Sequence, residues 1–216
     1  MNSKKEEIQL LKSALANGNV PLCIPVGNPV LAFLRVTAVD KKFQNKNDVA
    51  ALTGYRNRFV KSFLTEFNAT EAQTSKWLDE YVAPNPSKIL FMIDDLNRHT
   101  VGYMGIDFID WDKAYGEADA IVRGENAPKG LMTQALLTLL KWAHSHLGLK
   151  TIGVRVLSDN SAVNFYKKMG FEEVKQVPLK KTEATGKVSW VEDDALKSAE
   201  RYLVHMNFQM NLLLNG

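Results

Sequence analysis

The sequence predicts an α+β domain in which a mixed sheet is layered with helices, and three observations support this fold class. Three strand-like runs follow one another with short turns between them, at residues 88–93, 100–109 and 116–123. A long amphipathic segment then begins at Gly130. After it, the pattern alternates between strand and short helix up to residue 208. Together these elements describe a three-strand meander followed by a β-α-β-α-β run.

The elements before the meander are mostly helical. Patterns of helical or strand spacing occupy residues 8–16 (helix), 30–36 (strand), 48–60 (helix) and 70–82 (helix). Thr70 is the expected N-cap of the last of these helices, with Gln73 as its capping-box partner. We expect one domain over residues 1–216, with residues 1–20 as an N-terminal helical extension.

The elements after the meander follow from periodicity and from their boundary residues. The helix that starts at Gly130 has an apolar stripe at Met132, Leu136, Leu139, Leu140, Ala143 and Leu147. The next elements are expected at residues 151–158 (strand), 161–170 (short helix), 171–179 (strand) and 201–208 (strand). Gly170 is a natural residue to end the short helix. Residues 191–201 are expected to form a surface loop or a short helix.

Composition and charge exclude several classes of function. The net charge is +3, from 27 basic and 24 acidic side chains that are scattered along the chain. Such a balance favours neither a nucleic-acid stripe nor a polybasic membrane patch. No apolar run reaches the roughly 20 residues that cross a bilayer, and the N-terminus lacks a signal core. We expect a soluble, cytoplasmic protein.

Cys23 is the single cysteine of the chain. One thiol permits neither an intrachain disulfide nor a zinc cluster of thiolates. Its neighbours in the run VPLCIPV are apolar, so we expect a buried small side chain rather than a nucleophile. The four histidines show no metal-binding spacing, and no metal is expected.

The start of the long helix is a candidate anion site. A helix N-terminus presents backbone N–H groups without partners and the positive end of a dipole. Gly130 allows an anion to approach the backbone closely, and Lys129 and Arg123 can add positive charge.

Two carboxylates lie on the strand before this loop. Alternation places Glu117, Asp119 and Ile121 on one face of the strand, and Ala118, Ala120 and Val122 on the other. Carboxylates on a strand of small apolar residues suit a general base, although a solvated outer face would look the same. Glu117, Asp119 and water are the candidate bases.

Residues 156–171 carry a resemblance to a known family. Asn160, Ala162, Phe165, Tyr166, Gly170 and Phe171 reproduce a motif that is seen near the C-terminus of GCN5-related N-acetyltransferases. The run APKGLM then resembles the pyrophosphate loop of that family, with Ala127 and Met132 as departures from the usual residues. The element order from about residue 31 to residue 208 agrees with the family as well.

The resemblance implies a mostly antiparallel sheet and direct attack of a primary amine on the thioester of acetyl-CoA. It favours Glu117 over Asp119 as the base, because Glu117 lies ten residues before Ala127. It also implies that Tyr166 protonates the leaving thiolate and that Asn160 binds pantetheine or orders its loop. The remaining residues that it implies for acyl-CoA binding are Ile121, Val122, Arg123, Lys129, Gly130, Leu131, Met132 and Phe165.

The acceptor is expected from a mixed basic and aromatic segment. Arginines beside aromatic rings suit a diphosphate and a sugar or base. The residues in question are Arg56, Asn57, Arg58, Phe63 and Trp77. Their pattern resembles enzymes that acetylate nucleotide-linked amino sugars, so an amino sugar is the expected acceptor. The protein itself is expected to be a monomer or a homodimer. Acetylation of ribosomal or other protein N-termini is the first alternative, and a non-catalytic acyl-CoA sensor is the second.

Overall fold

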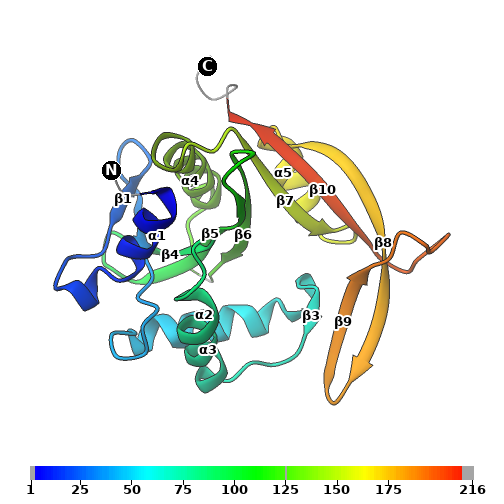
Figure 1. Ribbon diagram of the computed structural model, residues 1–216, viewed down its shortest axis with the longest axis horizontal. Coiled ribbons are helices and arrows are strands. Elements are labelled where there is room, and N and C mark those ends of the chain that lie inside the picture. The colour runs from blue at the N-terminus through cyan, green and yellow to red at the C-terminus, as the bar shows by residue number, and fades with distance from the viewer. Residues whose placement is uncertain (1–2, 125, 211–216) are drawn as a thin grey trace.

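The computed structural model describes residues 3–124 and 126–210 and confirms the predicted α+β fold (Figure 1). The strands are β1 (Cys23–Val26), β2 (Ala32–Val36), β3 (Thr65–Glu66), β4 (Ile89–Asp95), β5 (Thr100–Asp110), β6 (Tyr115–Arg123), β7 (Thr151–Leu157), β8 (Glu172–Ala184), β9 (Lys187–Glu192) and β10 (Tyr202–Gln209). The helices are α1 (Lys4–Lys12), α2 (Lys46–Arg58), α3 (Glu71–Trp77), α4 (Leu131–Leu147) and α5 (Ala162–Lys168). Short helical turns occupy Leu15–Asn17 (η1), Val60–Ser62 (η2) and Leu78–Val82 (η3).

The strands form one twisted sheet in the order β1-β2-β4-β5-β6-β7-β10-β8-β9-β3. Among the described strands, β6 and β7 are the one parallel pair, and the other neighbours are antiparallel. The predicted meander is confirmed as β4, β5 and β6. A parallel pair in the middle of the sheet requires a crossover, and α4 supplies it between β6 and β7.

Helices cover both faces of the central strands. In β4 the side chains alternate, so Phe91 packs with α4 while Leu90 and Met92 pack with α2 and η3. The larger core lies on the α4 face and includes Ile8 of α1, which is fully buried. The predicted N-terminal extension is therefore part of the packed domain, because α1 contributes to its main core.

The helix boundaries follow from capping. Thr70 and Gln73 form the predicted capping box at the start of α3. The first helix begins four residues earlier than the expected residue 8, because Ser3 and Glu6 form a capping box there.

Edge elements account for most of the differences from the prediction. The prediction missed β1, β3 and β9, and Val191 and Glu192 belong to β9 rather than to a loop. The expectation that Cys23 is buried was wrong, since its side chain is exposed. Cys23 begins β1, which pairs with β2 alone, so the edge leaves it in solvent.

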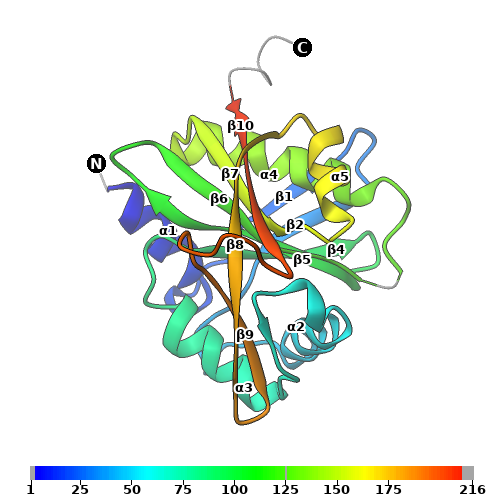
Figure 2. The ribbon, with the colours of Figure 1, turned by 90° about the vertical axis from the view of Figure 1, so that its right-hand side faces the viewer.

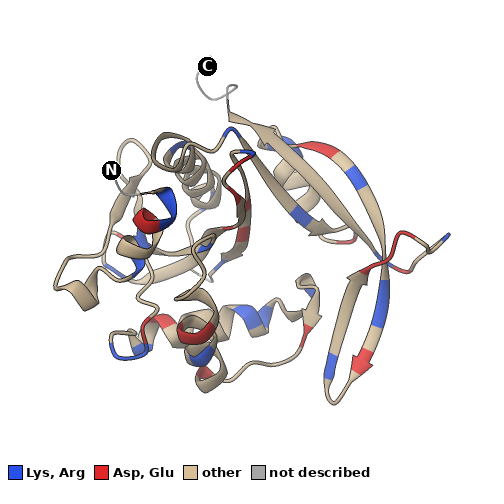
Figure 3. Ribbon diagram, in the orientation of Figure 1, with Lys and Arg blue, Asp and Glu red and all other residues tan. Residues whose placement is uncertain are grey.

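Charged residues of both signs are scattered over the ribbon in the orientation of Figure 3. The arrangement agrees with the near balance of charges in the sequence. Within the described residues, no helix is both long and apolar enough to cross a membrane.

Candidate functional site

The site lies where β6 and β7 separate. Their parallel pairing covers three positions, Tyr115↔Thr151, Gly116↔Ile152 and Glu117↔Gly153, and beyond it the strands diverge (Figure 1). A cavity of about 570 Å³ occupies the opening. It is lined by residues 118–123 of β6, by the start of α4, by β7, by α5 and by the segment after α2. The backbone edge of β6 is thus available to a ligand along this stretch.

A β-bulge shapes β6 at the cavity. Gly105 of β5 pairs with Asp119 and Tyr103 pairs with Val122, so β6 holds one residue more than β5 between these pairs. Ala120 has a φ of 52° at this point, and the alternation of side chains changes phase. The expectation that Ile121 shares a face with Asp119 was therefore wrong. Ile121 packs with the core on the α4 face, and Ala120 packs with the core on the α2 face.

The start of α4 has the features of an anion site. Gly130 is its N-cap with a φ of 83°, and no side chain caps the helix. A Cβ at Gly130 would meet no atom within 4 Å, so the positive φ rather than crowding favours glycine here. The amides of Met132 and Thr133 lie in the first turn, where no intrahelical acceptor is available. Both residues line the cavity.

Two basic residues flank this helix end. Arg123 and Lys129 are exposed and line the cavity. Arg123 also donates a 2.7 Å hydrogen bond from Nη2 to the carbonyl of Ala127, which ties the loop to β6. Leu131, which was predicted to bind the donor, is buried in the core and does not line the cavity.

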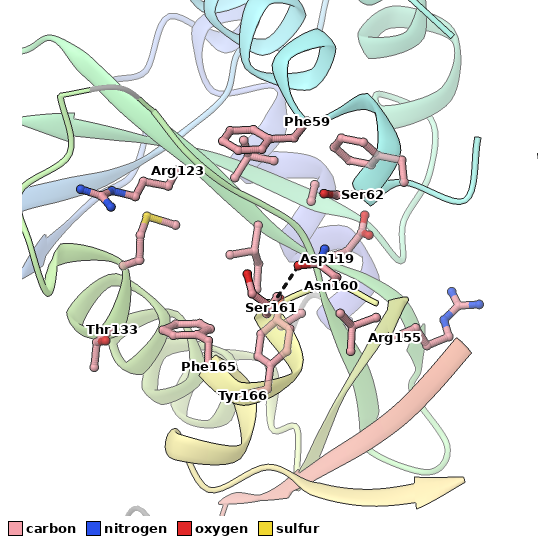
Figure 4. A pocket seen from close by; sticks show the side chains of 18 of the residues that line it. Phe59, Ser62, Asp119, Arg123, Thr133, Arg155, Asn160, Ser161, Phe165 and Tyr166 are labelled. Atoms are coloured by element: carbon pink, nitrogen blue, oxygen red, sulfur yellow. Dashed lines mark hydrogen bonds between the residues drawn. The ribbon is translucent and has the colours of Figure 1, made fainter. Parts of the chain in front are cut away.

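Tyr166 lies at the inner wall of the cavity, on α5 (Figure 4). Its ring packs between Phe165 at 5.4 Å and Phe171 at 5.6 Å, measured between ring centroids. The hydroxyl has no hydrogen-bond partner within the described part of the chain. Burial and the nearby charge of Asp119 raise the pKa of the phenol, so it stays protonated at neutral pH.

Asn160 and Phe165 also line the cavity. The side chain of Asn160 accepts a 2.9 Å hydrogen bond from the backbone N–H of Ala162. This bond orders the turn that leads into α5 and fixes the loop on that side of the cavity.

The two candidate bases have different surroundings. Asp119 lines the cavity, whereas Glu117 is not among the lining residues. The carboxylate of Glu117 accepts a 2.6 Å hydrogen bond from Nε of Arg155 and a 3.1 Å bond from the hydroxyl of Tyr115. Glu117 is thus held in an ion pair beside the cavity, while Asp119 faces into it.

Asp119 also belongs to a buried ion network with Lys88 and Asp107, which the sequence analysis did not predict. Lys88 is 4% exposed, and its Nζ donates to Oδ2 of Asp107 at 2.5 Å and to Oδ2 of Asp119 at 2.7 Å. Burial opposes the charged form of Lys88, but the two carboxylates outweigh it and raise the pKa of the ammonium. The available signal was a lysine directly before one apolar strand and an aspartate within the next, since such charges are buried only in pairs.

Most of the predicted acceptor residues have structural contacts. Arg56 donates from Nη1 to the carbonyl of Phe67 and from Nη2 to that of Thr65 at 2.9 Å. Asn57 exchanges hydrogen bonds of 2.8 and 2.9 Å with the backbone of Ala69. Together they hold the segment after α2 in place, outside the cavity lining.

Of the remaining acceptor candidates, Phe63 lines the cavity, whereas Trp77 and Arg58 do not. Trp77 stacks on Tyr81 and packs against the core on the α2 face. Arg58 lies over the ring of Phe59, with 5.4 Å between Cζ and the ring centroid. Phe63 does line the cavity, together with Phe59 and Ser62, which were not predicted.

A family model for the acetyltransferase (GNAT) domain matches residues 41–172, which is more than half of the chain. The chain belongs to the GNAT acetyltransferase family. Enzymes of this family use acetyl-CoA, and the chain is accordingly an N-acetyltransferase. No curated protein gave a significant sequence match.

Solved structures with a similar fold include spermidine N-acetyltransferases of Vibrio cholerae. A point mutant of SpeG superposes with a TM-score of 0.63 at 17% identity, covering 86% of this chain and 97% of that one. The same enzyme in complex with CoA and spermine gives a TM-score of 0.64 at 16% identity, covering 79% and 95%. A dodecameric SpeG structure gives 0.61 at 17% identity, covering 86% and 97%. At such identities the likeness establishes the fold, and it does not support the predicted amino-sugar subgroup.

Proposed function

We propose that this GNAT enzyme acetylates a small aliphatic primary amine. The observation that carries the proposal is a single cavity that brings together three features. These are the N-terminus of α4, the open backbone edge of β6, and two lining side chains, Asp119 and Tyr166. A donor with an anionic tail and a cationic acceptor can therefore meet in one space.

The donor end fits acetyl-CoA. The free amides at the start of α4, with Arg123 and Lys129, suit the pyrophosphate. The β6 backbone beyond Glu117 can pair with the amide groups of pantetheine, as a further strand would. At the bulge, the turned backbone of Ala120 and Ile121 can direct an N–H toward the thioester oxygen, where negative charge develops.

The acceptor end fits a cation. Asp119 presents a carboxylate whose Oδ2 is held by Lys88, and its side chain remains 38% exposed toward the cavity. Phe59 and Phe63 also line the cavity and supply aromatic rings. An ammonium group pairs with the carboxylate, and an aliphatic chain lies against the rings.

Two side chains then move protons. The bound ammonium first gives one proton to solvent by way of Asp119, because only the neutral amine has the lone pair that attacks the thioester. As the new C–N bond forms, the attacking nitrogen becomes acidic, and Asp119 accepts this second proton directly or through one water. Tyr166 keeps its proton until the thiolate departs, because burial favours the neutral phenol. Lys88 and the aromatic neighbours of Tyr166 hold both groups in position, which lowers the entropic cost of the reaction.

The class of amine follows from what lines the acceptor end. A nucleotide-linked amino sugar would need free cations for its diphosphate, but Arg56 and Asn57 bind backbone groups of their own segment. Arg155 does line the cavity, and it is paired with Glu117. The SpeG structures come from spermidine N-acetyltransferases, one of them solved with spermine bound. An aliphatic amine of the polyamine type is consequently the acceptor class that we propose.

Thiol release from acetyl-CoA tests this proposal with a panel of acceptors. The panel contains spermidine, a simple alkyl diamine, a free amino sugar, a nucleotide-linked amino sugar and a peptide with a free N-terminus. We expect the highest kcat/KM with an aliphatic amine. The Asp119→Asn variant should lose most of this activity. A clear preference for the nucleotide-linked sugar or for the peptide would overturn the acceptor class. Calorimetric binding of acetyl-CoA without turnover of any amine would instead indicate a sensor.

A further inference from the structure

The acceptor side of the cavity has a wall formed by residues 59–66, between α2 and α3. Phe59, Ser62 and Phe63 of this wall line the cavity. The wall is joined to the far end of the sheet, where β3 pairs with β9 through Thr65↔Ser189 and Glu66↔Val188. Figures 1 and 2 both show β3 beside β9, on the arm that β8 and β9 extend from the sheet. The position of the wall thus depends on this arm.

Arg201, just before β10, is the residue that connects the wall to its surroundings. Its Nη1 lies 3.1 Å from Oε1 of Glu66, and its Nη2 donates a 3.0 Å bond to the carbonyl of Lys61. The same oxygen of Glu66 accepts a 2.7 Å bond from Nε1 of Trp190. The guanidinium lies over the Trp190 ring, 5.0 Å from its centroid. One side chain thereby holds the wall segment at two points, Lys61 and Glu66.

Arg201 also holds the opposite side of the cavity. Its Nε and Nη2 donate to Oδ2 of Asp159 at 3.0 and 2.7 Å. Asp159 immediately precedes Asn160 and Ser161, which line the cavity on the β7–α5 side. The planar guanidinium therefore spans from the acceptor wall to the β7–α5 loop, and its contacts set the width of the cavity between them.

These contacts lie apart from the catalytic groups. The small apolar cluster beneath Arg201 consists of Leu157, Leu179, Trp190 and Leu203, with Leu64 and Val188 packed against it. This cluster is separate from the two cores that surround the central strands. The side chain of Arg201 is 12% exposed and does not line the cavity. Its loss would loosen the wall while the centre of the sheet remains packed.

We propose that Arg201 is a positioning residue that determines which acceptors the enzyme selects. By fixing residues 59–66 against β9 and the β7–α5 loop, it keeps the acceptor end narrow, so that a slender amine fits and a peptide chain does not. This inference rests on the proposed acetylation of a small amine at the same cavity.

The test uses Arg201→Lys and Arg201→Met in the full-length enzyme, with Lys181→Met as the matched control. A lysine cannot contact Glu66, Asp159 and the Lys61 carbonyl together, because it lacks the planar fork. Lys181 is also a cation near the Trp190 ring, at 5.9 Å, but its ion-pair partner is the exposed Glu183. The measurements are the KM of the amine, the affinity for CoA, and the activity ratio between a peptide and the small amine.

We expect Arg201→Lys to raise the KM of the amine about tenfold, the value of roughly one charge-assisted hydrogen bond. Arg201→Met should raise the KM of the amine further. In both variants the affinity for CoA should stay within about twofold of the wild type. The activity ratio between peptide and small amine should shift toward the peptide. Lys181→Met should resemble the wild type. An unchanged amine KM and peptide ratio in a folded variant would overturn the proposal, as would equal losses of amine and CoA binding. If Arg201→Met does not fold, Arg201→Lys decides. A wild type that acetylates no amine would contradict the proposed function itself.

Discussion

Asp119→Asn is the most informative single change in the site. Asparagine preserves the size of the side chain and removes its charge and its ability to accept a proton. The structure predicts two separate effects, one on catalysis and one on stability. They can be separated because Asp119 faces the cavity on one side and Lys88 on the other.

The catalytic effect is a fall in kcat of about 10²–10⁴-fold, which is the usual value of general base catalysis. The effect on stability comes from Lys88, which is 4% exposed and would keep only Asp107 as a charged partner. Loss of one charge-assisted hydrogen bond at a buried site costs about 1.5–3 kcal/mol in the free energy of unfolding. The variant should therefore fold, with a lower Tm, and bind CoA nearly as the wild type does.

Glu117→Gln is the matched control, since Glu117 lies two positions earlier on the same strand. Its carboxylate is paired with Arg155 and does not line the cavity, so its loss should lower stability and leave most of the turnover. The assay is thiol release at saturating acetyl-CoA, together with urea unfolding of both variants. A larger loss of kcat in Glu117→Gln than in Asp119→Asn would refute our assignment and return the role to Glu117.

Three further predictions concern the remaining parts of the structure. Tyr166→Phe should lower kcat about 10- to 100-fold with CoA affinity retained, and the loss should shrink with an acyl donor of more acidic thiol; a constant loss across donors would exclude the acid role. Gly130→Ala should cost about 1–2 kcal/mol at its left-handed φ and weaken CoA binding in calorimetry, so an unchanged affinity would place the phosphates elsewhere. Burial lowers the pKa of Lys12 from 10.5 to about 8, so the unfolded state binds more protons between these values and stability should rise with pH. The gain, at most about 3 kcal/mol, should be absent in Lys12→Met when urea unfolding is compared at pH 7.5 and pH 10.

The parts of the fold that sequence patterns predicted are those with strong local signals. The apolar runs of β4 and β5 are buried on both faces of the sheet, and the stripe of α4 is buried apart from Met132, which lines the cavity. The capping pair of Thr70 and Gln73 fixed the start of α3 without any tertiary information. By contrast, β3 is two residues long and exists because β9 pairs with it. No local pattern encodes such a partner, and the arm that positions the acceptor wall was missed for that reason.

The candidate site shows the same division. Lysine, glycine and the helix pattern at residues 129–147 were sufficient to predict where α4 begins, because a helix N-terminus is a local feature, and the anion site there stays a prediction. The acceptor residues were less accessible to prediction. Arg56 and Asn57 have the composition of a ligand site, yet their partners are carbonyls and amides of their own connecting segment. Composition does not reveal which donor a folded loop uses internally.

The bulge at Ala120 accounts for another miss. Strict alternation predicted that Asp119 and Ile121 lie on the same face of β6. A single extra residue in β6 places the side chain of Ile121 on the other face. Such a residue is visible only in the register between two strands, since both the inserted and the paired residues have strand-like composition.

The two carboxylates of β6 illustrate how the end of a strand pair assigns function. Glu117 pairs with Gly153, the last position at which β6 and β7 are joined, and its diagonal neighbour on β7 is Arg155. Within a joined pair, that neighbour is close enough to form an ion pair, and it does so at 2.6 Å. Two residues later the strands have separated, so Asp119 has no partner on β7 and lines the cavity. Lys88, directly before β4, donates a hydrogen bond to Oδ2 of Asp119. The point where pairing stops therefore places one carboxylate in an ion pair and leaves the other open to the cavity. A variant that extended the β6–β7 pairing by two residues should close the cavity and place Asp119 in a structural role as well.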